Sequence, residues 1–200
     1  MVTTLIIALA LTLHTTTAIA VDSYRFETIS VPGSNCTSAS KINARKQIVG
    51  GYCDGSRSRS FLSKRGKFIF IDPPESVNDS ALGINDRGQV VGLFVDVNGV
   101  EHGYLWDDGE FTTIDFPGAS GTVARGINRP GHIVGNYALG DRVSHGFRLV
   151  EGVFETIDVP GSTSTIASGI NDRGAVVGTY QDAGFLSLGF FAGWWEFRND

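Results

Sequence analysis

Short runs of β-branched and aromatic residues, separated by glycine-rich turns, fill the chain from residue 26 onward. One run, Phe-x-x-Ile followed by Pro-Gly, begins at Phe26, Phe111 and Phe154, and a less regular copy at Phe68 ends in Pro-Pro-Glu. Pro sets φ and Gly accepts the positive φ of a turn, so each run has the pattern of a strand that stops there. No stretch has the pattern of an amphipathic helix, and the chain is therefore expected to be all-β.

A second segment leads from small residues through a tight turn into a Val-Val-Gly strand. It is clearest at residues 168–180, SGINDRGAVVGTY, and it recurs three more times. The asparagines that begin these turns are 42, 43 and 43 residues apart: Asn43, Asn85, Asn128 and Asn171. A fixed period of this size indicates a repeat architecture.

Each period has room for four strands joined by hairpins and no room for a helix. This predicts a four-bladed β-propeller of four-stranded antiparallel blades, with about 43 residues per repeat. An open propeller fragment that closes by dimerisation and a β-solenoid are the alternative architectures. The predicted repeats are 26–67, 68–110, 111–153 and 154–200, in one domain that spans 21–200. Residues 26–30 are expected to complete the last blade, with 194–197 as the alternative source of that strand.

The repeated motif resembles a known family. Gly-Ile-Asn-Asp-x-Gly-x-Val-Val-Gly, followed by His-Gly and then Phe or Tyr, is similar to the HAF-type extracellular repeats of bacterial secreted proteins, from Phe26 to about Phe191. The resemblance implies secretion and a β-propeller-like fold, and it implies no particular activity. The first repeat departs from the motif with Arg59-Ser60 in place of His-Gly, and the last has Leu188 in place of His.

The first twenty residues differ from the repeats. An apolar run from Leu5 to Leu13 precedes Ala18-Ile19-Ala20, which is typical of a secretory signal peptide cleaved before Val21 and is too short to span a membrane comfortably. We expect residues 1–20 to be a signal peptide and the protein to be secreted or periplasmic. No later segment is apolar enough to cross a bilayer.

The only two cysteines, Cys36 and Cys53, both lie in the first repeat. If the turn at Asn43 pairs Ile42 with Gln47, the cysteines lie opposite each other on neighbouring strands. A disulfide is therefore expected, and it fits an oxidising compartment.

The sequence contains no nucleophile elbow, no zinc-protease motif and no phosphate-binding loop, so we expect no catalytic residues, no metal and no cofactor. His102 and His145 occupy the same repeat position, but two imidazoles without a recurrent carboxylate or third ligand do not make a zinc site. A structural role in the strand is favoured for them, with binding as the alternative. The four turn asparagines are explained by turn chemistry, and together they would form a ring at one mouth of the channel, where a water or an ion could sit.

Charge is unevenly distributed. Residues 41–67 contain eight of the sixteen Lys and Arg and one acid, whereas seven basic and eighteen acidic residues follow from residue 68. Consecutive hairpin turns lie at alternate ends of a sheet. The first turn of the first repeat, at Arg45, and its third turn, at Lys64, are therefore expected on one rim of the propeller. Arg57 and Arg59 are expected in the second connection, a loop on the opposite rim. The denser rim cluster consists of Arg45, Lys46, Lys64, Arg65 and Lys67. The uneven charge indicates an anionic partner, a head-to-tail contact, or an ordinary solvated surface.

These features predict a secreted or periplasmic β-propeller that acts as a binding module for a glycan, a protein or an anionic polymer or surface. Nucleic acid is an improbable partner for an exported protein with a net charge of −5. The alternatives are a secreted polysaccharide hydrolase or lyase with its site at the channel mouth, and a structural envelope or matrix protein.

Overall fold

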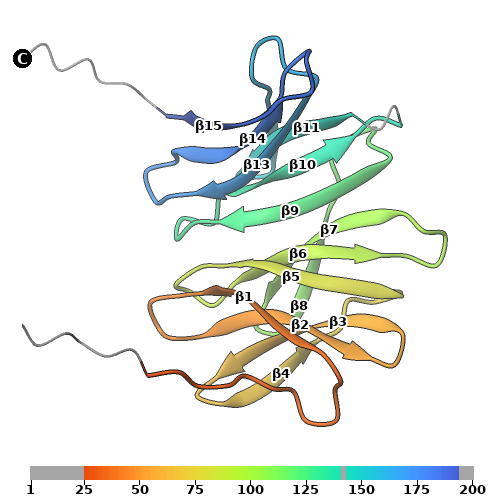
Figure 1. Ribbon diagram of the computed structural model, residues 1–200, viewed down its shortest axis with the longest axis vertical. Coiled ribbons are helices and arrows are strands. Elements are labelled where there is room, and N and C mark those ends of the chain that lie inside the picture. Colours follow the sequence, from red (N-terminus) through yellow and green to blue (C-terminus); the bar gives the residue numbers. More distant parts are fainter. Residues whose placement is uncertain (1–24, 141–142, 194–200) are drawn as a thin grey trace, which may run out of the picture.

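The computed structural model describes residues 25–140 and 143–193 (Figure 1). These residues form fifteen strands in four antiparallel sheets, and they contain no helix. The first sheet contains β1 (Thr37–Ile42), β2 (Ile48–Asp54), β3 (Arg57–Lys64) and β4 (Lys67–Ile71), and the second contains β5 (Asn78–Ile84), β6 (Val90–Val95), β7 (Glu101–Asp107) and β8 (Glu110–Ile114). The third contains β9 (Gly121–Ile127), β10 (Ile133–Ala138), β11 (Ser144–Val150) and β12 (Val153–Ile157), and the fourth contains β13 (Ser164–Ile170), β14 (Val176–Gln181) and β15 (Ser187–Ala192).

Within each sheet, every strand pairs with its neighbour in sequence. The Phe-x-x-Ile runs form β4, β8 and β12, the last strands of the first three sheets, so each sheet begins later in the chain than the predicted repeat. The strand expected at residues 26–30 is not formed, and Phe26 is exposed. The fourth sheet therefore lacks a fourth strand among the described residues, and residues 194–197, the alternative source, lie outside them.

The tight turns form as the sequence predicts. In the second repeat, the side-chain Oδ1 of Asn85 accepts hydrogen bonds from the backbone N–H groups of Arg87 and Gln89, at 3.0 and 3.1 Å. Gly88 takes a φ of +93°, which the turn requires and which glycine adopts without steric cost. In the first repeat Lys46 holds the same place with a φ of +57°.

Gly135 shows why each Val-Val-Gly strand needs its glycine. The register between β9 and β10 shifts by one residue beside Gly135. A Cβ at Gly135 would overlap the Val123 carbonyl oxygen and lie 2.8 Å from a ring atom of Phe147. The space of a side chain is thus taken by the neighbouring strand and by an aromatic ring that fills the core.

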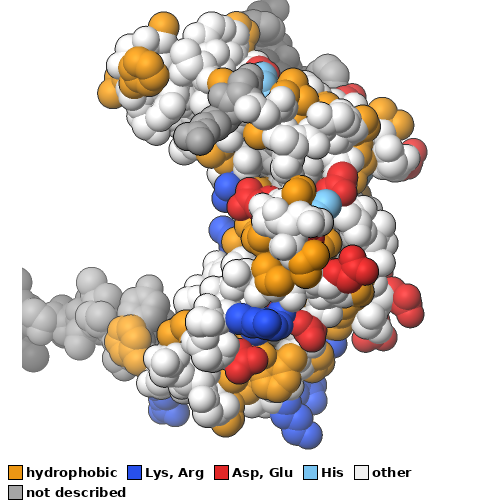
Figure 2. Space-filling model, turned by 90° about the vertical axis from the view of Figure 1, so that its right-hand side faces the viewer, with side chains coloured by type: hydrophobic (Ala, Val, Ile, Leu, Met, Phe, Trp, Pro, Cys, Tyr) orange, Lys and Arg blue, Asp and Glu red, His pale blue; other side chains and the backbone are white. Residues whose placement is uncertain are grey.

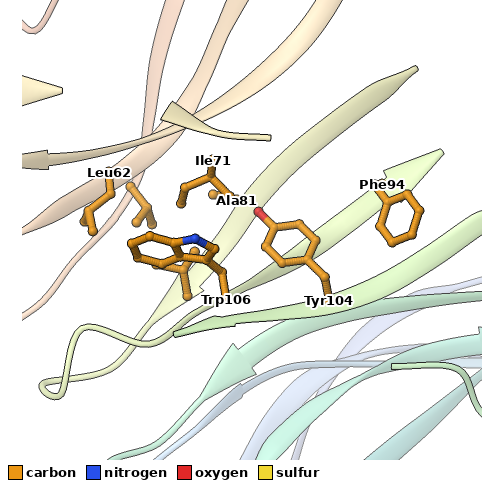
Figure 3. Packing of buried hydrophobic residues seen from close by; sticks show 8 residues of the cluster. Leu62, Ile71, Ala81, Phe94, Tyr104 and Trp106 are labelled. Carbon is orange, nitrogen blue, oxygen red and sulfur yellow. The ribbon is translucent and has the colours of Figure 1, made fainter. Parts of the chain in front are cut away.

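The core lies between consecutive sheets. In the best-filled junction, Leu62 and Ile71 of the first sheet pack with Ala81, Tyr104 and Trp106 of the second (Figure 3). Equivalent clusters join the second sheet to the third and the third to the fourth. Because each sheet buries its apolar surface on the next, hydrophobic burial stabilises the array one junction at a time.

The four sheets stack along the long axis, and in space-filling view the molecule bends into an arc (Figure 2). The expected all-β repeat fold with antiparallel sheets is confirmed. The four sheets of residues 25–140 and 143–193 do not close into a ring.

The expected disulfide is confirmed, because Cys36 and Cys53 are bonded with a Cα–Cα distance of 5.2 Å. The register from which it was predicted is wrong by one residue at the turn, where Ile42 pairs with Ile48 instead of Gln47. An irregularity between Ala39 and Lys41 shifts the register back, which brings the cysteines opposite each other. No helix in the described part of the chain is long and apolar enough to span a membrane.

Candidate functional site

A cavity of about 420 Å³ opens beside the outer strands of the second sheet. It lies between the turn that links the first two sheets and the strands β6, β7 and β8. Aromatic rings, prolines, carboxylates and one histidine line it: Pro73, Pro74, Glu75, Phe94, Asp96, His102, Tyr104, Phe111, Thr113 and Asp115. We call this space the His102 cavity.

His102 is held from three sides. Its Nδ1 lies 3.0 Å from a carboxylate oxygen of Asp115, and its Nε2 lies 3.8 Å from a carboxylate oxygen of Asp96. Phe94 stacks against the imidazole with a centroid distance of 5.0 Å and an interplanar angle of 24°. The hydrogen bond to Asp115 and the stacked Phe94 ring therefore orient the imidazole, and Nε2 points towards Asp96.

The pairing of His102 with an aspartate recurs through the repeats, which the sequence analysis missed. His145 Nδ1 lies 2.7 Å from Asp158, and in the first sheet Arg59 lies 3.0 Å from Asp72. All three pairs are separated by thirteen residues in sequence. The expectation that the two histidines lack a recurrent carboxylate was wrong. The equal spacing of the aspartates, each of which directly follows a Phe-x-x-Ile strand, is the signal that would have shown it.

The turn that forms one wall of the cavity is irregular. In the other three repeats a glycine takes the left-handed position at the end of the Pro-Gly turn, as in Gly118 with a φ of +79°. In the second repeat Glu75 adopts the same conformation with a φ of +62°. A side chain in this region costs about 1 to 2 kcal/mol relative to right-handed backbone. The Glu75 side chain also lines the cavity.

The carboxylates of the cavity are suited to accept hydrogen bonds. The Val100 backbone N–H donates to Asp96 at 2.8 Å, and this bond lowers the pKa of Asp96 below its usual value. Burial raises the pKa of Tyr104, whose hydroxyl lies 3.5 Å from Ser60 Oγ and stays protonated at physiological pH. The cavity thus combines carboxylate acceptors, Asp96 among them, with neutral aromatic surface.

A buried ion pair lies beside the cavity, at the junction of the first two sheets. Arg59 contacts Asp79 at 3.2 Å, and the side chains are 13% and 0% exposed. Burial raises the pKa of Asp79, and interactions with Ser60, Arg59 and Ser76 oppose this rise without cancelling it. Arg59 lies inside β3, so its expected place in a loop at the rim was wrong.

The basic rim cluster is partly brought together. Arg45, Gln47, Lys64 and Arg65 line a separate cavity of about 340 Å³. Lys67 pairs with Lys64 across the β3–β4 hairpin. The Arg45 guanidinium also donates to the Arg87 carbonyl oxygen, which ties the first sheet to the second. The first and third turns therefore lie on the same rim, as expected, and Arg57 begins β3 at its other end.

The four turn asparagines form a row, one per sheet, instead of the expected ring. The side-chain Nδ2 of each of the first three donates to the backbone carbonyl of the next asparagine, at 2.9, 2.9 and 3.0 Å. Beside this row lies a groove of about 230 Å³ to which all four sheets contribute. The amides of Asn43, Asn85 and Asn128 are thus engaged in holding neighbouring sheets together.

Within the described residues, no group of three or more His, Cys, Asp or Glu side chains is arranged to hold a metal ion. No protein-family model and no curated protein matches this chain.

Proposed function

We propose that this protein is an extracellular carbohydrate-binding module and that the His102 cavity is its glycan site. The observation that carries the proposal is the combination, in one cavity, of carboxylate acceptors with aromatic and proline surface. Sugar hydroxyl groups donate to carboxylates, and the C–H faces of a sugar ring pack on apolar surface. Ligand pockets commonly pair such an apolar lining with a few placed polar groups.

The charge of the cavity narrows the ligand class. Glu75, Asp96 and Asp115 all line it, so a uronic-acid or sulfated glycan would meet like charges there. A neutral glycan or one that carries amino groups avoids this repulsion.

The architecture and location belong to the same proposal. We propose that the four sheets are blades of a propeller-type array, open in this structure, and that the chain is a member of the HAF-type extracellular repeat family. The recurrent motif, the stacked antiparallel sheets of three or four strands and the 42 to 43 residue period support this. The disulfide and the apolar leader, residues 5–13, support export to an oxidising compartment.

Binding and turnover of a defined oligosaccharide panel test the function. The panel contains tri- to hexasaccharides of glucose, N-acetylglucosamine and glucosamine, with heparin fragments as anionic members. We expect saturable binding of a neutral or amino-bearing member without turnover, and at least tenfold weaker binding for Asp115→Asn. The matched control is Asp158→Asn, which alters the equivalent pair in the third sheet and should leave binding unchanged.

The other results separate the alternative functions. Turnover of a panel member would support the hydrolase or lyase alternative. Equal loss of affinity in the two aspartate variants would place the effect outside the His102 cavity. No binding of any member would overturn the carbohydrate proposal.

A second candidate function is binding of an anionic polymer at the basic rim. It is favoured by the cavity in which Arg45, Lys64 and Arg65 meet, with Gln47 as a polar neighbour. Exposed charges are screened beyond a Debye length of about 8 Å at physiological ionic strength, so retention on heparin should fall steeply with salt. Lys64→Glu should elute at lower salt than Arg57→Glu, which reverses one charge at the opposite end of the same strand. Equal elution of the two variants would indicate an ordinary solvated surface.

A further inference from the structure

Every junction between consecutive sheets is built from the same two faces. We call the face of a sheet that packs on the next sheet in chain order its leading face, and the face that packs on the preceding sheet its trailing face. The leading face contributes the valine that precedes the glycine of the second strand. The trailing face of the next sheet contributes an alanine from its first strand. These side chains are 0 to 1% exposed: Val49 with Ala81, Val91 with Ala124, and Val134 with Ala167. The same surfaces are therefore buried three times within one chain.

A hydrogen bond between asparagines accompanies each junction. The backbone carbonyl of Asn85 accepts from Gly88 N–H within its own turn and from the Asn43 side chain of the preceding sheet. This second bond is geometrically specific, because both groups are held by their own turns. It sets how one sheet is placed on the next.

At the end of the array, the leading face of the fourth sheet is uncovered by any described sheet. Val177, the counterpart of Val134, is 49% exposed. Asn171 Oδ1 accepts the usual turn hydrogen bonds from Arg173 and Ala175 N–H. Its Nδ2, however, has no acceptor among residues 25–140 and 143–193.

The trailing face of the first sheet is the complement of this surface. Ile42 is 63% exposed, whereas its counterpart Ile127 in the third sheet is 7% exposed. Ala39, the counterpart of the buried alanines, is also exposed. The Asn43 carbonyl accepts from Lys46 N–H and, within the described residues, from no preceding asparagine. One end of the array presents a donor and an apolar face, and the other presents the matching acceptor and apolar face.

We propose that a second copy of this chain docks head to tail, with the trailing face of its first sheet on the leading face of the fourth sheet. Asn171 Nδ2 of one copy then donates to the Asn43 carbonyl of the other, and Val177 packs against Ile42 and Ala39. The junction between the two copies then has the same geometry as the three junctions within one chain, and the stack continues beyond β13–β15. The first sheet of the same chain lies at the opposite end of that stack (Figure 1).

Such an interface joins two different surfaces, so it is heterologous. Heterologous contacts form rings when their rotation closes and filaments when it does not. The arc of the molecule gives each added copy a defined rotation (Figure 2). The expected species in solution are therefore larger than a monomer and increase with protein concentration. This inference is independent of the carbohydrate proposal, because it uses other residues.

Sedimentation velocity of the mature, disulfide-bonded chain over a hundredfold concentration range tests the interface. Wild-type protein should associate, and Val177→Glu should raise the dissociation constant at least tenfold, because it places a charge in the junction. Val153→Glu is the matched control. Val153 is exposed in β12, and its counterparts in the first and second sheets, Lys67 and Glu110, are already charged. Circular dichroism and a thermal melt verify that both variants fold.

Complementation makes the test specific for a head-to-tail contact. Val177→Glu retains an intact trailing face, and Ile42→Glu retains an intact leading face. Each alone should be monomeric, and a mixture should form a one-to-one dimer that cannot extend. A monomeric wild type, unaltered association of Val177→Glu, or failure of the mixture to form dimers would overturn the proposal. Association only after deletion of residues 194–200 would also overturn it, because the chain's own C-terminal segment would then be the occupant.

Discussion

Removal of the Arg59 side chain is the perturbation whose outcome follows most directly from the structure. Arg59 contacts both Asp72 and Asp79, but Asp72 is 73% exposed and Asp79 is fully buried. Arg59→Met keeps an unbranched side chain of similar length and leaves a buried carboxylate without its cation. Loss of one partner from a buried pair costs about 3 to 5 kcal/mol, so we expect the free energy of unfolding to fall by about 3 kcal/mol at pH 7.

The pH dependence of this loss has a defined sign. Burial raises the pKa of Asp79 in the folded protein, so the folded state takes up a proton at a higher pH than the unfolded state. The contribution of Asp79 to stability is therefore fully present below its unfolded pKa of about 4 and is lost as the pH rises through its folded pKa. Without Arg59 the folded pKa rises further, and the penalty of Arg59→Met should shrink as the pH falls from 7 towards 4.

Urea denaturation at pH 7 and pH 4.5, with the disulfide intact, measures both effects. Arg59→Met/Asp79→Asn removes both charges and should recover most of the stability lost at pH 7. Equal urea midpoints for wild type and Arg59→Met at pH 7, or a penalty that does not change with pH, would show that Arg59 does not stabilise a buried Asp79 carboxylate.

Two further predictions concern the fold. Gly135→Ala should lower the free energy of unfolding by roughly 2 kcal/mol or more, because its Cβ would overlap the neighbouring strand. Gly121→Ala, where a Cβ meets only ordinary contacts, should be neutral or slightly stabilising. Equal urea midpoints for the two variants would count against the described packing. The native protein should show no reactive thiol in a thiol titration, and two reactive thiols would contradict the disulfide. Reduction of the Cys36–Cys53 bond, which closes a sequence separation of 17, should lower the free energy of unfolding by about 3 kcal/mol.

The periodic features of the fold could be predicted from the sequence because each has a local cause. The asparagine turns and the Pro-Gly stops depend on neighbouring residues, so a regular spacing revealed four equivalent units. The strand predicted at residues 26–30 is absent from the structure. Its prediction required pairing with the last sheet, far away in sequence, and no local pattern specifies such a pairing. The register at Ile42 was wrong because one extra residue follows Ala39 in the first strand. The same irregularity follows Ala81, Ala124 and Ala167, so the recurring alanine was the signal that would have shown it.

The candidate site was harder to predict because it depends on contacts across strands. His102 was identified, but Asp115 was not, although the spacing of thirteen residues recurs three times. Glu75 gave no sequence signal, since a glutamate after two prolines does not specify a left-handed backbone. Arg59 was assigned to a loop although it takes the place of the motif histidine, and His102 and His145 lie within strands. Its ion pair with Asp79 gave no sequence signal, because it forms only when the first two sheets pack.

Nuclear magnetic resonance of the histidine side chains tests the carbohydrate proposal most directly. The oligosaccharide from the panel that binds most tightly is titrated into the protein, and the imidazole resonances of His102 and His145 are followed. Both histidines pair with an aspartate in the same way, but only His102 lines the cavity. The account predicts a saturable shift at His102 and none at His145. An unchanged His102 resonance at saturating ligand, or equal shifts at the two histidines, would contradict it.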